Sequence, residues 1–215
     1  MDAALTRRLR EGADAVGVPL EPGALPAFGA YLDLLLTWNR RINLTSVTAP
    51  AAVVDRHFVD CLALAPLLPH RTTLLDVGSG AGFPGVVVAL ARPDLRVTLC
   101  ESRAKRVAFL LALVNRLKVR AEVLQVRSEE LVDPGERTFD SVVSRAVLPL
   151  EDWAVHGPEL VGPGGQLCAM VSSVPEVAPG IDGFTAADAV RYALPGGAQH
   201  AILRWRRLAS QSLVR

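Results

Sequence analysis

The residues with the clearest potential for chemistry lie in a glycine-rich segment between Asp76 and Gly85. This segment runs Asp-Val-Gly-Ser-Gly-Ala-Gly-Phe-Pro-Gly. It follows an apolar run that predicts a strand and opens a stretch that predicts a helix. Glycines allow the backbone to turn tightly and to approach a ligand closely, where a Cβ would collide. A loop of this kind between a strand and a helix predicts a nucleotide-binding site.

The spacing within the loop distinguishes between two kinds of cofactor. Phe83 stands where the dinucleotide pattern Gly-x-Gly-x-x-Gly has its third glycine. Pro84 lacks the amide donor that a pyrophosphate could use at a helix start. Asp76, just ahead of the first glycine, would repel a pyrophosphate and attract an amino group or a sulfonium. The loop therefore favours a positively charged cofactor over a dinucleotide.

Glu101 stands directly after the next predicted strand, residues 96–100. An acidic residue at that place can accept two hydrogen bonds from the ribose hydroxyls of an adenosine. Together with the glycine loop and Asp76, it favours S-adenosylmethionine as the cofactor. The competing interpretation is structural: Asp76 caps a turn, and Glu101 caps the helix that begins near Ser102.

Polar residues also follow the third and fourth predicted strands. Ser128 and Glu129 come just beyond the third strand, where they could flank an adenine. Equally, they could cap a helix and supply acids to its first turn. Arg145 follows the fourth strand, and its planar fork could orient the methionine carboxylate or hold a phosphate or carbonyl oxygen. A surface salt bridge is the structural alternative for Arg145.

Short apolar runs alternate with helical stretches from Thr72 onward, and this alternation predicts the sheet that positions these side chains. Apolar strands without polar interruptions are typical of a parallel sheet covered on both faces. The expected strands are residues 74–77, 96–100, 121–126, 139–144, 166–171, 190–194 and 200–205. Pro195-Gly196-Gly197 predicts an antiparallel hairpin between the last two. The expected fold class is α/β, a doubly wound, mostly parallel, Rossmann-like sheet.

A helical segment is expected ahead of this sheet. Apolar residues at helical spacing predict one helix that ends near Trp38, and a second helical piece is expected over 51–68. We therefore expect an N-terminal helical extension over 1–70 and a cofactor-binding domain over 71–215. Within the second helical piece, Arg56, His57 and Asp60 favour a structural clamp between the two parts over a catalytic role.

Composition excludes several classes of protein. Half of the residues are hydrophobic and the net charge is +1, which argues against disorder and against a polybasic coat. The three cysteines and four histidines show no metal-binding spacing, so we expect neither a zinc site nor a disulfide framework. No secretory signal or long apolar run is visible, so we expect a cytoplasmic protein. Nothing in the pattern requires more than a monomer.

Several blocks of this sequence resemble one family. The chain is similar to class I S-adenosylmethionine-dependent methyltransferases and, more narrowly, to the bacterial small-subunit ribosomal RNA methyltransferase G family, also called glucose-inhibited division protein B. The blocks run in family order from about residue 30 to 150, and they are Trp38-Asn39, Asn43-Leu44-Thr45-Ser46, Arg56-His57-Phe58-Val59-Asp60, Asp76 to Gly85, Arg103 to Leu110, Arg127-Ser128-Glu129-Glu130 and Ser144-Arg145-Ala146.

The resemblance implies methyl transfer from S-adenosylmethionine to N7 of one guanine in 16S ribosomal RNA, with that RNA or the 30S subunit as partner. The family's cofactor contacts carry over to Gly78, Phe83, Ser128, Glu129 and Arg145, and the ribose argument adds Glu101. No catalytic residue is assigned. Guanine N7 carries an exposed lone pair and the sulfonium methyl is a strong electrophile, so holding the two in line can supply much of the catalysis.

Two sequence features bear on the acceptor. The family usually has Lys-Gly after the fifth strand, where this chain has Ser172-Ser173. The run from Arg103 to Arg120 carries cations without an acid, so it is either an RNA-facing surface or a solvated helix face. The alternatives are a divergent methyltransferase acting on another RNA or a small molecule, a non-catalytic binding module and, last, a dinucleotide oxidoreductase.

Overall fold

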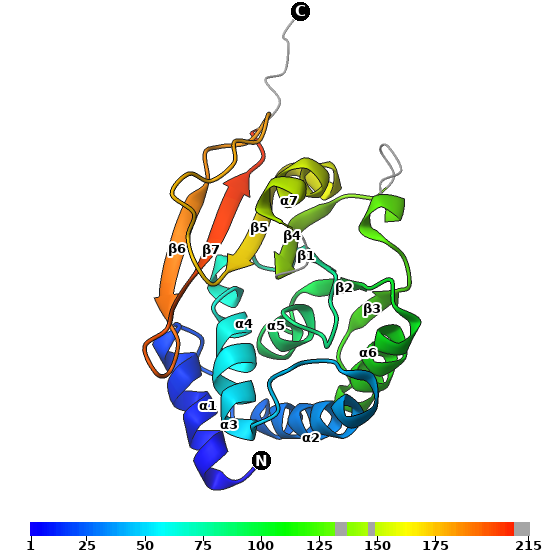
Figure 1. Ribbon diagram of the computed structural model, residues 1–215, viewed down its shortest axis with the longest axis vertical. Coiled ribbons are helices and arrows are strands. Elements are labelled where there is room, and N and C mark those ends of the chain that lie inside the picture. The colour runs from blue at the N-terminus through cyan, green and yellow to red at the C-terminus, as the bar shows by residue number, and fades with distance from the viewer. Residues whose placement is uncertain (132–136, 146–148, 209–215) are drawn as a thin grey trace, which may run out of the picture.

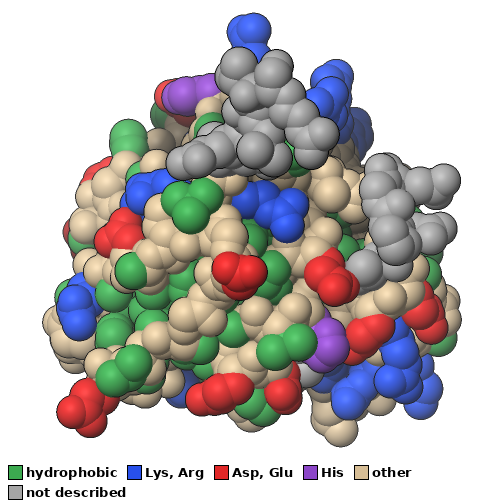
Figure 2. Space-filling model, turned by 90° about the horizontal axis from the view of Figure 1, so that it is seen from above, with side chains coloured by type: hydrophobic (Ala, Val, Ile, Leu, Met, Phe, Trp, Pro, Cys, Tyr) green, Lys and Arg blue, Asp and Glu red, His purple; other side chains and the backbone are tan. Residues whose placement is uncertain are grey.

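The computed structural model describes residues 1–131, 137–145 and 149–208. Ala146, in the last of the blocks named above, lies outside these ranges. Within the described residues, no helix combines the length and the apolar character that a membrane crossing requires. The face seen in Figure 2 carries acidic and basic side chains that are interspersed rather than gathered by sign.

A single seven-stranded sheet organises the chain, with strand order β3-β2-β1-β4-β5-β7-β6 (Figure 1). The strands are β1 Thr73–Val77, β2 Arg96–Cys100, β3 Ala121–Leu124, β4 Phe139–Arg145, β5 Val161–Val171, β6 Asp188–Ala193 and β7 Gln199–Arg206. The first five are parallel, and β7 runs antiparallel to both β5 and β6. The expected fold class and the C-terminal antiparallel hairpin are therefore confirmed.

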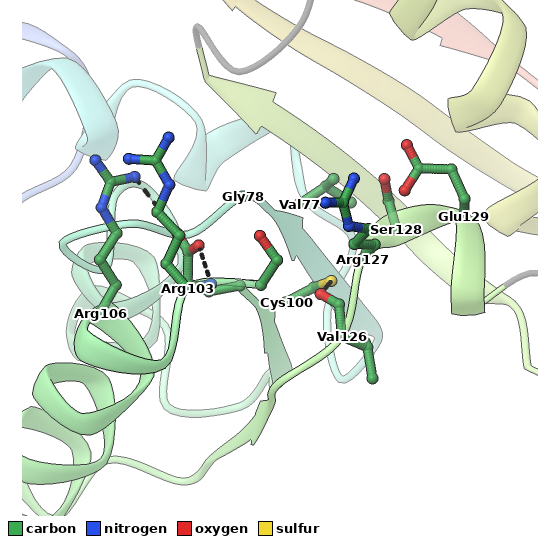
Figure 3. Close-up of a pocket in the computed structure, with 11 residues that line it drawn as sticks. Val77, Gly78, Cys100, Arg103, Arg106, Val126, Arg127, Ser128 and Glu129 are labelled. Atoms are coloured by element: carbon green, nitrogen blue, oxygen red, sulfur yellow. Dashed lines mark hydrogen bonds and ion pairs between the residues drawn. The ribbon is translucent and has the colours of Figure 1, made fainter.

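The order of the strands reverses next to β1, which pairs with β2 on one side and with β4 on the other. The chain runs outward from β1 through β2 to β3 and then returns to β4. The loops that follow β1, β2 and β3 consequently meet at the carboxyl edge of the sheet (Figure 3). Open α/β sheets bind their ligands at such a switch point.

Helices cover both faces of this sheet. They are α1 Ala3–Ala15, α2 Leu25–Ile42, α3 Pro50–Val53, α4 Asp60–Leu62, α5 Gly85–Ala91, α6 Ala104–Leu117 and α7 Leu150–His156. Short 3-10 turns lie at Ala65–Leu67, Ser128–Leu131 and Gly157–Leu160. A π-helical turn, Val54–Val59, joins α3 to α4, so the helical piece expected over 51–68 is present but changes its winding along its length.

Side chains from the two faces of the sheet belong to two buried clusters. Successive residues of a strand alternate between them: Leu74 lies in the first cluster and Leu75 in the second. The first cluster reaches Leu9 of α1 and Phe28 of α2, whereas the second includes Trp153 of α7. Residues on both sides of the expected boundary at 70 thus share one core, and the division into two domains stays a prediction.

The glycine-rich stretch from Gly162 to Gly165 lies inside β5 rather than ahead of it. Phe139 pairs with Val161 and Ser141 with Gln166, so the four intervening residues leave the register of the ladder. A Cβ at Gly165 would lie 2.9 Å from the carbonyl oxygen of Asp140. The turn signal in the sequence therefore marks a bulge, and the strand resumes beyond it.

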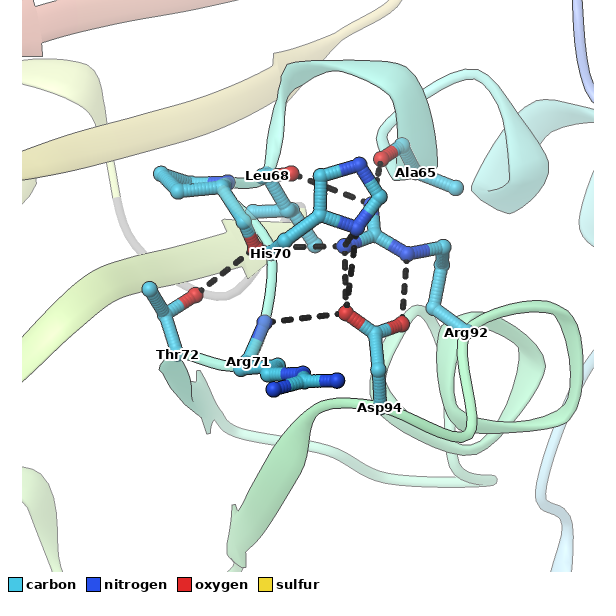
Figure 4. Close-up of polar contacts among 8 residues, drawn as sticks. Ala65, Leu68, His70, Arg71, Thr72, Arg92 and Asp94 are labelled. Atoms are coloured by element: carbon cyan, nitrogen blue, oxygen red, sulfur yellow. Dashed lines mark hydrogen bonds and ion pairs between the residues drawn. The ribbon is translucent and has the colours of Figure 1, made fainter.

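An arginine–aspartate clamp holds the opposite, amino-terminal edge of the sheet (Figure 4). Arg92 Nη1 donates to the carbonyl oxygens of Ala65 and Leu68 at 2.9 and 3.0 Å. Its Nε and Nη2 donate to the two oxygens of Asp94, which also accepts the backbone N–H of Arg71. The clamp ties the end of the helical segment to the β1 and β2 region. Hydrogen bonding to Arg92 lowers the pKa of Asp94 from its usual value.

We expect Asp94→Asn to destabilise the protein, because it removes the charge that pairs with Arg92. The loss should be only about 1 kcal/mol at pH 7, because solvent screens part of the ion pair. A depressed folded-state pKa contributes stability above the unfolded pKa of about 4 and loses it as the pH falls below that value. The penalty should therefore begin to shrink as the pH falls below about 4, and it should disappear as the pH approaches the lowered pKa of Asp94. Urea unfolding at several pH values measures it, with the exposed Asp33→Asn as control. An equal penalty at every pH would contradict the assignment.

Candidate active site

A cavity of about 370 Å³ lies where the loops after β1, β2 and β3 meet. It brings together Gly78, Glu101, Ser128 and Glu129 of the expected cofactor contacts (Figure 3). The full set of lining residues is Val77, Gly78, Cys100, Glu101, Ser102, Arg103, Arg106, Val126, Arg127, Ser128 and Glu129. Phe83 and Arg145, the other two expected contacts, are not among them.

Glycines determine the path of the loop that forms one wall. Gly78, Gly80 and Gly82 all have positive φ, at 71°, 55° and 90°, a region that other L residues rarely adopt. At Gly82 space is also restricted, since a Cβ would lie 2.7 Å from Tyr31 Oη. The same hydroxyl donates to the carbonyl oxygen of Ala81 at 2.6 Å. Helix α2 therefore holds the loop in place through Tyr31.

Asp76 lies at the base of this loop and is completely buried. Its Oδ2 accepts the backbone N–H of Gly85 at 2.9 Å, at the start of α5. A Cβ at position 85 would lie 2.7 Å from that oxygen, so the close approach requires glycine. Oδ1 has no hydrogen-bond partner among the described residues. Burial raises the pKa of Asp76 to about 7. The structure thus contains the expected turn cap and leaves one acceptor oxygen unsatisfied.

Glu101 links the glycine loop to the start of α6. Its Oε2 accepts the N–H of Gly80 at 3.1 Å, and its Oε1 accepts the N–H of Arg103 at 2.9 Å. Arg106 Nη1 lies 3.6 Å away. The carboxylate therefore caps α6, as the structural interpretation expects, while it also lines the cavity. Each carboxylate oxygen can accept more than one hydrogen bond, so the two roles are compatible.

Ser128 and Glu129 begin the short 3-10 turn after β3 and lie across the cavity from Arg103 and Arg106 (Figure 3). They lie beyond the carboxyl end of β3, and their placement at an adenine stays a prediction. Three arginines at the cavity, Arg103, Arg106 and Arg127, were not expected there. The signal was present, since Arg103 and Arg127 follow the ends of β2 and β3 within a few residues.

Phe83 and Arg145 meet in a second cluster, around His57 of the π-helical turn. The rings of Phe83 and His57 stack with centroids 4.6 Å apart. The guanidinium carbon of Arg145 lies 5.6 Å from the centre of the Phe83 ring. Arg145 Nε pairs with Asp60 Oδ2 at 3.0 Å, and Nη2 donates to the carbonyl oxygen of Arg56 at 2.7 Å. This ion pair is largely buried, unlike the surface salt bridge considered as the alternative.

The most specific blocks of the resemblance surround this second cluster. Asn39 exchanges two hydrogen bonds with the backbone of Thr45, at 2.9 and 2.8 Å. Thr45 Oγ1 lies 2.9 Å from Nε2 of His57. Burial and the charge of Arg145 lower the pKa of His57 to about 4. His57 is therefore a neutral, packed side chain at pH 7, which agrees with the expected clamp between the helical segment and the sheet.

The cations of the run from Arg103 to Arg120 divide between two surroundings. Arg103 and Arg106 line the cavity, and Arg106 is partly buried beside Glu101. Lys105, Arg116, Lys118 and Arg120 are exposed.

Comparison with known proteins agrees with this geometry. The family model described as rRNA small subunit methyltransferase G matches residues 24–178. A relative named "Ribosomal RNA small subunit methyltransferase G" from Anaeromyxobacter sp. (strain Fw109-5) is 43% identical over 96% of this chain and 99% of its own length. The protein of the same name from Myxococcus xanthus (strain DK1622) is 38% identical over 76% of each chain.

Solved structures give the fold independently. TrmN from Thermus thermophilus superposes with a TM-score of 0.52 and 17% identity, covering 72% of this chain and 53% of the other. At that identity the likeness concerns the fold alone. The family match and the relatives also bear on the activity, and they confirm that the chain is a methyltransferase, as expected. The chain belongs to the ribosomal RNA small subunit methyltransferase G family.

Proposed function

We propose that this protein transfers the methyl group of S-adenosylmethionine to N7 of a guanine in 16S ribosomal RNA. The observation that carries the proposal is the cavity at the switch point, where Gly78, Glu101, Ser128 and Glu129 converge in a member of this family. In a bacterium this acceptor, as free RNA or as the 30S subunit, would place the enzyme in the cytoplasm.

The residues present fit the proposed cofactor. Ser128 and Glu129 would flank the adenine, and Glu101 would accept from the ribose hydroxyls. The unsatisfied Oδ1 of Asp76 supports the fit, because a buried acceptor without a partner favours a ligand that brings a donor, such as an α-amino group. S-adenosylmethionine supplies an electrophilic methyl group on a sulfonium.

The titratable groups Cys100 and His57 lie near the site, and both are uncharged at pH 7. This suits a methyl transfer that needs no general base. Burial raises the pKa of Cys100, in the cavity, to about 12, so its thiol stays protonated. His57, with its pKa lowered to about 4, is neutral and already engaged with Thr45. Guanine N7 loses no proton when it is methylated. The chain's contribution is then to bind and orient the two reactants, which is worth up to about 7–11 kcal/mol of the barrier.

Exposed cations near the cavity would contact the RNA backbone. Arg103 and Arg127 line the cavity and are exposed to solvent, and Lys105 is exposed on the first turn of α6. Phosphate contacts of this kind make binding fall steeply with salt, because counterions are released. Ser172 and Ser173, where the family usually has Lys-Gly, are exposed after β5 and supply no cation there.

Gly80→Asp should weaken cofactor binding strongly. The substitution places a side chain at φ +55°, with its Cβ 3.6 Å from Nη1 of Arg106, and it adds a negative charge to the loop whose backbone N–H binds Glu101. Strain and charge repulsion together should weaken binding of S-adenosylmethionine by on the order of 100-fold, as measured by calorimetry. Gly183→Asp is the matched control, since Gly183 also has positive φ but no atom near its Cβ. Unchanged affinity in the Gly80 variant would refute the site.

Methyl transfer itself is tested with labelled S-adenosylmethionine and separated bacterial ribosomal subunits whose 16S RNA lacks N7-methylguanine. We expect label in the small-subunit RNA, at N7 of a guanine, and a rate that falls as salt is raised. No label, with cofactor binding intact, would move the function to another acceptor. Loss of cofactor binding as well would remove the proposed enzyme activity.

A further inference from the structure

A second polar cavity, of about 570 Å³, lies at the carboxyl end of α2. Within the described part of the chain, it shares no lining residue with the cavity at the switch point. Its polar lining consists of amides, hydroxyls and one guanidinium, and among the described residues none of its lining is acidic. All of these groups can donate hydrogen bonds, which suits an anionic ligand. The polar lining residues are Asn39, Arg40, Asn43, Thr45, Ser46 and Thr48.

The wall of this second cavity is fixed by its own backbone. Asn43 has a left-handed conformation, with φ at 49°, and it ends α2. The loop that follows is held against the last turns of the helix, because Asn39 exchanges two hydrogen bonds with the backbone of Thr45. The side chains of Arg40, Ser46 and Thr48 are exposed. The loop is therefore in place before a ligand arrives, and its donors are accessible.

The hydroxyl of Thr45 is oriented by the network beneath it. Arg145 Nη2 lies 3.0 Å from Nδ1 of His57, and a guanidinium can only donate, so Nδ1 accepts. The proton of the neutral His57 ring is then on Nε2, which donates to Thr45 Oγ1 at 2.9 Å. The backbone N–H of Val47 donates to the same oxygen at 3.1 Å. Both acceptor sites of Thr45 Oγ1 are thus used, and its own proton is left to donate to a ligand in the second cavity.

The second cavity lies close to the elements that form the reaction site. His57, the partner of Thr45, stacks on Phe83 at the end of the glycine loop. The ring of Trp38 contacts that of Phe109 at 5.7 Å, which places the end of α2 beside the first half of α6. The start of α6 carries the exposed cations Arg103 and Lys105. An RNA strand whose guanine enters the reaction site would thus find further cations and donors along this face.

We propose that the second cavity is a phosphate subsite for the RNA strand, in which Arg40 pairs with a phosphate that flanks the nucleotide to be methylated. Thr45 and Ser46 donate their hydroxyls to the same phosphate. The planar fork of an arginine matches two phosphate oxygens, and such charge-assisted pairs are strong. This inference rests on the proposed function and deepens it, because it names the residues that would hold the RNA outside the cofactor cavity.

Arg41 offers a matched comparison for Arg40. Both arginines are exposed and both lie in the last turn of α2, where a cation complements the negative end of the helix dipole. Of the two, only Arg40 lines the second cavity. Replacing either one removes the same charge from the same helix end, but only one replacement removes the expected phosphate contact.

The test compares Arg40→Gln with Arg41→Gln in the full chain. Binding to 30S subunits that lack N7-methylguanine is measured at several salt concentrations with S-adenosylhomocysteine, the cofactor without its methyl group. We expect Arg40→Gln to weaken binding by about 10-fold at low salt and to reduce the slope of log K against log salt concentration by about 1. Arg41→Gln should stay close to the wild type. Affinity for S-adenosylmethionine, measured by calorimetry, should be unchanged in both.

Ser46→Ala tests the subsite without changing the charge. Loss of one hydroxyl should weaken binding to the 30S subunit by about 5-fold and leave the salt dependence unchanged, since no cation is removed. A purely electrostatic role of the helix end predicts no effect of this variant. Wild-type affinity in Ser46→Ala would therefore contradict a hydroxyl contact with the phosphate.

Three further results would overturn the inference. Equal losses in the two arginine variants would show that Arg40 acts through the charge of the helix end alone. An unchanged salt dependence in Arg40→Gln would exclude a phosphate contact, and a fall in its S-adenosylmethionine affinity would assign the second cavity to the cofactor. Failure of the proposed function gives a different result, since wild-type protein would then leave 30S subunits unlabelled. Wild-type protein that does not bind the 30S subunit even at low salt would contradict both.

Discussion

Burial of the Asp60 carboxylate obliges distant parts of the chain to meet around it. A charged oxygen removed from water must be paired or hydrogen-bonded, and removing one partner of such a pair is strongly destabilising. Asp60 finds its partners on β4, β6 and β7, and it projects from a helical segment that precedes the sheet. One carboxylate thus joins the helical segment, the parallel half of the sheet and the C-terminal hairpin.

The second constraint is the closeness of the backbone around the glycine loop. Asp76 and Tyr31 approach positions 85 and 82 so closely that a methyl group would collide with either. These contacts bring α5, α2 and the loop to one place before any ligand is bound. A site assembled in this way needs little reorganisation when it binds, which reduces the entropic cost of binding.

Most of the parallel sheet could be predicted from the sequence, because its strands are continuous apolar runs bounded by glycine and polar residues. The place of the cavity could also be predicted, since four residues that line it stand at strand ends that a parallel sheet brings together. They are Gly78, Glu101, Ser128 and Glu129. The local pattern could not show that Phe83 and Arg145 lie outside the lining of this cavity. Which side of the loop Arg145 takes is decided by its pairing with Asp60, a contact that no local pattern records.

The π-helical turn and the bulge in β5 escaped prediction for a related reason. Both depend on which hydrogen bonds a segment exchanges with its tertiary neighbours, and Val54–Val59 has no proline or glycine to mark the change. In β5 the glycines were visible, but the same residues serve equally well as a turn before a strand or as an irregularity within one. The glycines of β5 therefore indicated where the backbone departs from regular structure, but not whether it forms a turn or a bulge there.

The contact between Tyr31 and the glycine loop has an evolutionary consequence. Tyr31 Oη fills the space that a side chain at position 82 would need, and it also binds the neighbouring carbonyl of Ala81. A larger residue at position 82 therefore requires a smaller one at position 31, which would leave that carbonyl without its donor, and it also requires a shift of Val86, whose Cγ2 lies 2.9 Å from the same Cβ. Positions 31 and 82 are thus expected to vary together among descendants of this sequence, although they belong to different segments of the chain.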